Sequence, residues 1–286
     1  MSNNAGNVFY VEVPDGRIAY ESVGRGPLVV LCPGMADSRS SFRLLAPLIA
    51  RAGYRVVSVD LRGHGASSTG FSSYNHADTA TDLLEVVGAL GGPAVLVGQS
   101  FSGGAVTIAA ATTPDAVSAI VEIDPFTRPP AYSLTTFLRD RRYRRGAILL
   151  GRFAFTGSLK SWLKYLDLAY PGRKPADWDA WLAGLEANLR EPGRKEAAQK
   201  MAASSATLTQ AGAQLADIRC PALVVMGRED SDFPDPEAEA AAIVEHMPAG
   251  TGRYVMLANA GHYPHAEYPE AVADLIVAFL ADRTRG

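Results

Sequence analysis

The fold of this chain is decided by the stretch Val95-Leu96-Val97-Gly98-Gln99-Ser100-Phe101-Ser102-Gly103-Gly104. An apolar run typical of a buried strand breaks at a serine flanked by small residues, and a helix-like segment follows. This is the pattern of a nucleophile elbow, a sharp strand-to-helix turn that projects a serine hydroxyl. A serine hydroxyl becomes a useful nucleophile only beside a base and beside N–H groups that hold an oxyanion.

Ser102 departs from the usual form of this motif. The usual pattern is Gly-x-Ser-x-Gly, and Ser102 stands where its last glycine would be. There is also a plain alternative for Ser100, because serine at a strand-to-helix junction often serves as a helix N-cap. The partners that the rest of the chain offers to Ser100 have to decide between these two interpretations.

Size and composition are those of an ordinary globular protein. The chain has 286 residues, 48% hydrophobic and 20% charged, which allows one large domain or a domain with an insertion. A net charge of −3 gives no basic surplus for nucleic acid or an anionic membrane. Residues 1–7 lack the features of a secretory signal, and no apolar run approaches the ~18 residues of a membrane helix. The sequence therefore predicts a cytoplasmic protein without membrane or nucleic-acid partners.

Strand and helix signals alternate along most of the chain. Pro14-Asp15-Gly16 is a turn signal that predicts a hairpin of the first two strands, and a helix is expected from Phe42 to Ala52, closed by Gly53. Expected strands are Phe9–Val13, Arg17–Ser22, Leu28–Cys32, Arg55–Asp60, Ala94–Gly98, Val117–Ile123, Ala222–Met226 and Arg253–Leu257. Continuous apolar strands between helices indicate an α/β fold, a mostly parallel eight-stranded sheet with helices on both faces.

The alternation stops at Pro125. Only helix-forming stretches follow up to Asp217, so we expect a helical insertion over 126–217 between two core segments, 1–125 and 218–286. Four aromatic residues of this insertion line a substrate pocket in one interpretation and form the insertion's own core in the other. They are Trp162, Tyr165, Trp178 and Trp181.

A base for Ser100 is expected on a loop after a later strand, since functional groups gather at the carboxyl ends of parallel strands. His262 follows the last strand, and the neighbouring Gly261 favours an exposed loop. Asp230, just past the strand that ends at Met226, is the expected acid that orients the histidine. Three rival carboxyls stay open at this point, namely Asp124, Glu229 and Asp232.

Several segments together resemble the α/β-hydrolase fold superfamily over nearly the whole chain. These are Leu31-Cys32-Pro33-Gly34-Met35, Asp60-Leu61-Arg62-Gly63-His64-Gly65-Ala66-Ser67, the elbow, Gly227-x-x-Asp230 with Pro234, and the loop from Gly261 to Glu270. The order Ser100, Asp230, His262 is the order of this fold. The resemblance implies a catalytic triad of these three residues, an oxyanion hole made by the N–H groups of Met35 and Phe101, and a helical cap.

The elbow serine narrows the chemistry that the resemblance implies. Haloalkane dehalogenases and epoxide hydrolases of this fold use an aspartate there, whereas a serine supports acyl transfer. We expect hydrolysis of a carboxylic ester, lactone or thioester of a small apolar compound. The same triad also serves carbon–carbon bond hydrolysis, perhydrolysis, acyl transfer and lyase or cyclisation steps, and a ligand receptor is the non-enzymatic alternative. No nucleotide or metal motif appears, so we expect a small-molecule substrate and no cofactor.

Overall fold

The described residues form one eight-stranded sheet in this computed structural model, which describes residues 7–129, 134–204 and 206–282. The strands are β1 Phe9–Val13, β2 Gly16–Val23, β3 Leu28–Cys32, β4 Arg55–Val59, β5 Ala94–Gln99, β6 Val117–Ile123, β7 Ala222–Gly227 and β8 Gly252–Leu257. Their order is β1-β2-β4-β3-β5-β6-β7-β8. β3 to β8 run parallel, while β2 pairs antiparallel with both β1 and β4. The predicted hairpin and the mostly parallel sheet are confirmed.

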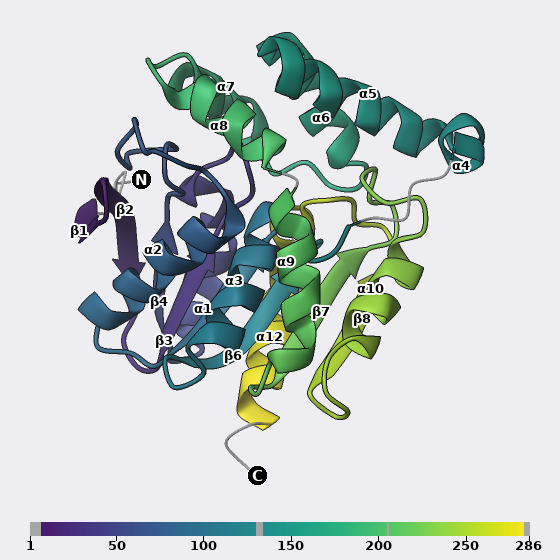
Figure 1. The fold of residues 1–286 in the computed structure, drawn as a ribbon. Helices are drawn as coiled ribbons and strands as arrows, with labels where there is room; N and C mark the ends of the chain where they lie inside the picture. The colour runs from purple at the N-terminus through teal and green to yellow at the C-terminus, as the bar shows by residue number, and fades with distance from the viewer. Residues whose placement is uncertain (1–6, 130–133, 205, 283–286) are drawn as a thin grey trace.

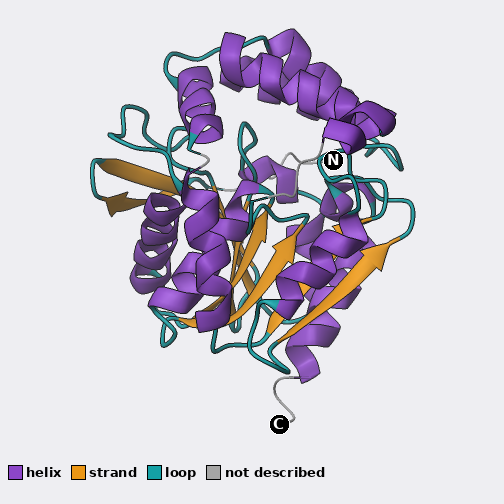
Figure 2. Ribbon diagram, turned by 45° about the vertical axis from the view of Figure 1, so that its right-hand side comes forward, coloured by secondary structure: helices purple, strands orange, loops and turns teal. Residues whose placement is uncertain are grey.

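Helices cover both faces of this sheet (Figures 1 and 2). One face packs against α1 (Leu45–Arg51) and α12 (Pro269–Asp282). The opposite face packs against α2 His76–Ala89, α3 Phe101–Thr112, α9 Ala206–Gln214 and α10 Pro236–Glu245. Because both faces are covered, the central strands are mostly apolar and do not alternate regularly with polar residues.

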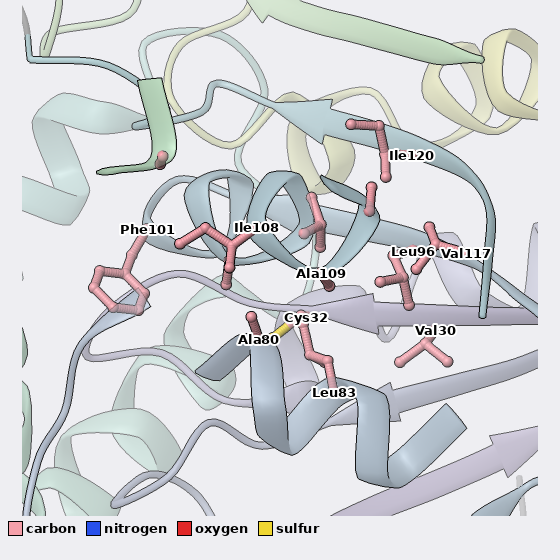
Figure 3. Packing of buried hydrophobic residues seen from close by; sticks show 14 of the residues in the cluster. Val30, Cys32, Ala80, Leu83, Leu96, Phe101, Ile108, Ala109, Val117 and Ile120 are labelled. Carbon is pink, nitrogen blue, oxygen red and sulfur yellow. The ribbon is translucent and has the colours of Figure 1, made fainter. Parts of the chain in front are cut away.

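Figure 3 shows the packing around α3. Leu96 of β5 and Val30 of β3 lie in the same cluster as Ile108 of α3 and Leu83 of α2. Each of these side chains is nearly inaccessible to solvent. Burial of apolar surface stabilises the fold by about 25 cal/mol per Å², so this layer holds β5 and α3, and with them the turn between them, in a fixed position.

Five helices between β6 and β7 lie across the carboxyl ends of the strands, toward which the arrowheads point (Figure 2). They are α4 Leu134–Arg139, α5 Arg141–Thr156, α6 Leu159–Ala169, α7 Trp178–Leu189 and α8 Arg194–Ala203. Much of this layer has a hydrophobic cluster of its own, formed mainly by residues of α5, α6 and α7. The expected helical cap is therefore present.

The last helix of the expected insertion lies elsewhere. α9 runs beside α3 on the sheet (Figure 1), and Ala211 of α9 and Leu215 of the following 3₁₀ turn (Leu215–Asp217) belong to the main core cluster. The helices that cover the strand ends are therefore α4–α8, a shorter segment than 126–217. Helical periodicity cannot separate these two locations, because an apolar helix face looks the same over the site as on the sheet.

The helix expected from Phe42 begins later than its apolar spacing indicates. A 3₁₀ turn, Arg39–Phe42, comes first and α1 starts only at Leu45. Gly53 follows the helix with a φ of +97°, the left-handed conformation expected of a glycine at this position. Within the described ranges, no helix has both the length and the apolarity needed to cross a bilayer.

Candidate active site

Ser100 stands alone between β5 and α3 in a strained conformation. Its φ and ψ are +53° and −120°, a region that non-glycine residues occupy at a cost of about 1–3 kcal/mol. Main-chain hydrogen bonds hold it there: the Ser100 N–H donates to the Ile123 carbonyl (2.9 Å), and the Ser100 carbonyl accepts the N–H of Phe126 (3.0 Å). At Gly98, an added Cβ would lie 2.3 Å from the Ser102 carbonyl oxygen, so the turn requires glycine there.

The Ser100 side chain points away from the helix that follows. It makes no capping hydrogen bond to α3, and its Oγ lies 2.8 Å from Nε2 of His262, a residue 162 positions further along the chain. The N-cap interpretation is therefore wrong. The two side chains have the separation needed for proton transfer between a hydroxyl and an imidazole.

The serine at position 102 links the elbow to the loop after β3. Its hydroxyl, fully buried, donates a hydrogen bond to the Pro33 carbonyl oxygen and contacts Cys32 Sγ at 3.2 Å. A glycine at this position would leave that link out. The departure from the usual motif thus has a local function, which is to join α3 to the backbone just before Gly34 and Met35.

Two N–H groups are available beside Ser100. The loop approaches so closely that a Cβ on Gly34 would lie 2.9 Å from Ser100 Cβ. Among the residues that the structure describes, neither the Met35 N–H nor the Phe101 N–H donates to a protein acceptor. N–H groups left free beside a nucleophile can hold the oxyanion that forms after attack on a carbonyl.

His64 supports this loop from the far side. Its Nε2 accepts the N–H of Ala36 (3.1 Å), and its Nδ1 bonds to the Arg62 carbonyl (2.9 Å). Burial lowers the pKa of His64 to about 4, so its ring is neutral and can act as an acceptor at neutral pH. His64 therefore has a structural role, which is to fix the residue next to Met35.

His262 is held between Ser100 and Asp230. Its Nδ1 lies 2.8 Å from Asp230 Oδ2, and both side chains are buried. The expected exposed loop is wrong: Gly261 is required because a Cβ there would lie 2.3 Å from Pro171 and 2.4 Å from the Ala169 carbonyl oxygen, both in the helical layer above. The glycine allows close approach of the cap, which shields the imidazole from solvent.

The charges around His262 favour its protonated form. Burial on its own lowers the pKa of this imidazole, but the nearby carboxylates of Asp230 and Asp232 outweigh burial and raise the pKa to about 9. An imidazole that accepts a proton in this site therefore forms a stabilised cation. This is the requirement for a base that holds a proton during one half of a reaction and returns it in the other.

The rival acid Asp124 lies beside Asp230 rather than beside the imidazole nitrogen. Its Oδ1 accepts the N–H of Gly227 (2.9 Å). Burial, the negative charge of Asp230 and a hydrogen bond with that carboxyl raise the pKa of Asp124 well above its usual value. The raised pKa favours the neutral form of Asp124, which lies next to the acid in contact with His262.

Three of these groups converge closely enough to be considered as metal ligands. One ligand atom from each of Asp124, Asp230 and His262 lies within 4.8 Å of the others. In this arrangement, however, Asp230 is hydrogen-bonded to His262 Nδ1, and Asp124 already bonds to a main-chain N–H. The hydrogen bonds between the groups themselves account for their proximity.

A second carboxyl reaches His262 from the opposite edge of the ring. Asp232 Oδ2 lies 3.6 Å from Nε2 and accepts a hydrogen bond from the Tyr165 hydroxyl (2.7 Å). The sequence indicated Asp232 only as a rival acid, and Tyr165 only as one of four aromatic residues of the insertion. The sequence does show two carboxyl residues two positions apart, Asp230 and Asp232. That both lie against His262 depends on where the folded chain places the imidazole.

The four aromatic residues divide into two groups. Tyr165 contacts the His262 ring edge-on, with centroids 6.4 Å apart, and Trp162 stacks behind Tyr165 at 5.1 Å. Trp178 and Trp181 instead pack against Tyr170, and the Trp181 indole N–H donates to Ser40. The structure thus brings Tyr165 into the site and places both tryptophans of α7 in the core of the cap.

A cavity of about 570 Å³ has Asp232, which contacts His262, in its wall. Its described lining residues are Phe126, Leu134, Phe137, Tyr143, Ala147, Leu150 and Asp232. Phe126 connects this cavity to the elbow, since its N–H bonds to the Ser100 carbonyl and its ring lies 6.0 Å from the His262 ring. The apolar chamber thus adjoins the site through Phe126 and Asp232, the two lining residues that contact Ser100 or His262.

Fold and site together define a class of protein: an α/β hydrolase with a serine at the elbow. Comparison with known families agrees, because the alpha/beta hydrolase family model matches residues 29–275, and the chain belongs to this family.

Known relatives cover a range of activities. Rat bifunctional epoxide hydrolase 2 is 32% identical over 125 residues, which are 42% of this chain and 23% of the relative, so the chain spans under a quarter of that protein. A 2-hydroxy-6-oxononadienedioate/2-hydroxy-6-oxononatrienedioate hydrolase of Burkholderia vietnamiensis is 27% identical over 94% of this chain and 93% of the relative. A thermophilic esterase structure from Thermogutta terrifontis superposes with a TM-score of 0.75 at 22% identity, covering 97% and 99% of the two chains.

Proposed function

We propose that this protein is a serine hydrolase that cleaves a carboxylic ester, lactone or thioester of a small apolar compound through an acyl-enzyme on Ser100. The observation that carries the proposal is the continuous chain of contacts from Ser100 Oγ to His262 Nε2 (2.8 Å) and from His262 Nδ1 to Asp230 (2.8 Å). In this order, a hydroxyl, a base and an orienting carboxylate are the parts that acyl transfer requires.

Acylation begins when Ser100 Oγ attacks the substrate carbonyl carbon while its proton passes to Nε2 of His262. The carbonyl oxygen becomes an oxyanion, which the N–H groups of Met35 and Phe101 hold. The bond to the leaving group then breaks, and His262 returns the proton to the departing oxygen or sulfur. Asp230 keeps the imidazole oriented and stabilises its cationic form.

Deacylation repeats these steps with water as the nucleophile. Nε2 takes a proton from water, the oxygen bonds to the acyl carbon, and collapse of the second tetrahedral intermediate releases the acid and restores the Ser100 hydroxyl.

The cavity walls are mainly apolar, which favours an apolar substrate portion. We further propose that α4–α8, the part of 126–217 that lies over the strand ends, form a cap that shields this chemistry. The cytoplasmic location stays a prediction.

Labelling with a fluorophosphonate probe tests the nucleophile directly. We expect a covalent adduct on Ser100, located by mass spectrometry of the proteolysed protein, together with turnover of short-chain p-nitrophenyl esters. The probe reacts only with a hydroxyl that a base has activated, so unactivated surface serines serve as internal controls. An adduct on another residue, or none, together with no ester turnover, would contradict the proposal.

The pH dependence of turnover follows from the raised pKa of His262. Only the neutral imidazole accepts the serine proton, so kcat/KM should rise about tenfold per pH unit below this pKa and level off above it. Since the pKa is raised to about 9, the rise should continue well above neutral pH. A rate profile between pH 6 and 10 with a neutral ester measures this, and a plateau already reached at pH 7 would contradict the raised pKa of His262.

A further inference from the structure

One short loop places a carboxyl at each edge of the His262 ring. Asp230 Oδ2 lies 2.8 Å from Nδ1, and Asp232 Oδ2 lies 3.6 Å from Nε2. The Asp232 N–H donates to the other oxygen of Asp230 (2.8 Å), which closes a tight turn and fixes the two side chains relative to each other. Triad chemistry uses the first carboxyl only, so the second is left without a function.

Asp232 is buried, and its environment is built around it. The side chain is only 2% exposed, its Oδ2 accepts the Tyr165 hydroxyl at 2.7 Å, and its Oδ1 accepts the Ser231 hydroxyl at 3.2 Å. Trp162 stacks against Tyr165 and holds that ring in place. A carboxyl buried at this depth and fixed from several sides has a defined position in the site.

Asp232 is also a charged group in the wall of the cavity. The other described lining residues are apolar except for Tyr143, and none of the described lining residues is a lysine, arginine or histidine. A carboxylate in such a wall is only weakly screened, because water and counterions are largely displaced when a substrate enters. Its charge therefore acts on whatever part of the substrate occupies this end of the cavity.

The position of Asp232 beside Nε2 indicates which part of the substrate lies near its charge. Nε2 is the nitrogen that returns a proton to the leaving group, so the leaving group has to come within hydrogen-bond distance of it. Asp232 Oδ2 is 3.6 Å from the same atom. The leaving-group oxygen of an ester consequently comes close to the carboxylate, and the alcohol portion extends from that oxygen.

We propose that Asp232, held by Tyr165, selects esters whose alcohol portion is neutral or positively charged and excludes those that carry a carboxylate there. This inference rests on the proposed serine-hydrolase function and adds a substrate class to it. Asp232 is a specificity residue in this scheme, and the proton transfers remain with His262.

Asp232 is ionised under ordinary assay conditions. Burial raises its pKa to about 6, even though the positive charge of His262 acts in the opposite direction. The titratable groups that face it are His262 and Asp230 around the ring, Tyr165 of α6, Tyr143 of α5, and Tyr263. All three tyrosines have a pKa raised above the ordinary value, so they stay neutral at pH 8, where the carboxylate is charged.

Three butyrate esters with different alcohol charges test the proposal at pH 8. Butyrylcholine is cationic, 3,3-dimethylbutyl butyrate is its neutral isostere, and 4-(butyryloxy)butanoate is anionic. We expect kcat/KM to fall in that order, by about tenfold at each step for a charge a few ångströms from the carboxylate. In Asp232→Asn the three values should converge within about threefold, and in Tyr165→Phe the spread should shrink partly, because the carboxylate loses its anchor.

The ratios of kcat/KM among the three esters separate charge selectivity from a general loss of activity. A change in folding or in the pKa of His262 affects all three esters alike. Asp235→Asn is the matched control. Asp235 lies in the same loop, is exposed and caps α10 by accepting the Ala238 N–H, and asparagine caps a helix equally well. This variant should keep the wild-type ratios.

A second readout does not depend on turnover. Choline, 3,3-dimethylbutanol and 4-hydroxybutanoate are the corresponding alcohols, and we expect them to slow fluorophosphonate labelling of Ser100 in the same order of potency. If Ser100 is labelled but kcat/KM is equal for all three esters and the three alcohols protect equally, the charge selection is overturned and the hydrolase function stands. Absence of both labelling and turnover overturns the proposed hydrolase function, and the selection with it.

Discussion

Replacing Ser100 by alanine is expected to lower kcat/KM for p-nitrophenyl esters by roughly four to six orders of magnitude. The variant keeps the oxyanion N–H groups and the cavity but has no atom that can form the acyl-enzyme. Its fold should be retained, because the hydrogen bonds at this position are made by the main chain, to Ile123 and Phe126, and none by the side chain to the helix.

Steady-state kinetics and thermal unfolding of the same preparations measure this prediction. Ser100→Ala should unfold at nearly the wild-type temperature and should not react with the fluorophosphonate. Ser72→Ala, which changes an exposed serine bonded to Asp15, provides the control and should keep full activity. If Ser100→Ala retained a tenth of the wild-type rate, another group would have to be the nucleophile.

Asp230→Asn is expected to reduce kcat by about three to four orders of magnitude. Asparagine fits the same space, but its amide donates to Nδ1 and favours the imidazole tautomer that carries its proton on Nε2. That tautomer cannot accept the Ser100 proton. The loss should appear mainly in kcat rather than KM, because Asp230 faces His262 Nδ1 and the cavity wall is formed by other residues.

Asp124→Asn is the matched comparison and should change kcat less than tenfold. Asp124 accepts the Gly227 N–H, and burial and the neighbouring Asp230 raise its pKa, which favours its neutral form. An asparagine amide has the same shape, is neutral and keeps the acceptor for the Gly227 N–H. The assignment of the acid would be reversed if Asp124→Asn abolished turnover while Asp230→Asn did not.

Much of the fold could be predicted from local patterns. Every expected strand is present, because fully buried parallel strands leave continuous apolar runs such as Leu28–Cys32. The helical layer between Pro125 and Ala222 was also visible as an interruption of the strand signals. The location of α9 was not, because burial of Ala211 against the sheet depends on contacts with α3 that have no local signature.

The candidate site likewise has residues that the sequence predicted and features that it did not. Ser100, His262 and Asp230 were predicted from turn motifs at the ends of strands, and the structure brings all three within hydrogen-bond distance. The burial of His262 was predicted wrongly, since Gly261 indicated an exposed loop when it in fact permits close approach of Pro171. A glycine in the sequence shows only that a side chain is absent. Whether the glycine serves flexibility or close packing depends on which residues face it in the fold.

By itself the sequence determined the order of elements, the eight strands and the elbow at Ser100, because each follows from interactions between residues near one another in the chain. Only the tertiary structure decided what surrounds the nucleophile. It placed Asp232 at the second edge of the imidazole, joined Tyr165 to it across 67 positions of sequence, and placed Asp124 next to Asp230, which raises the pKa of Asp124. Distances and charges between remote segments set these roles, and they exist only once the chain is folded.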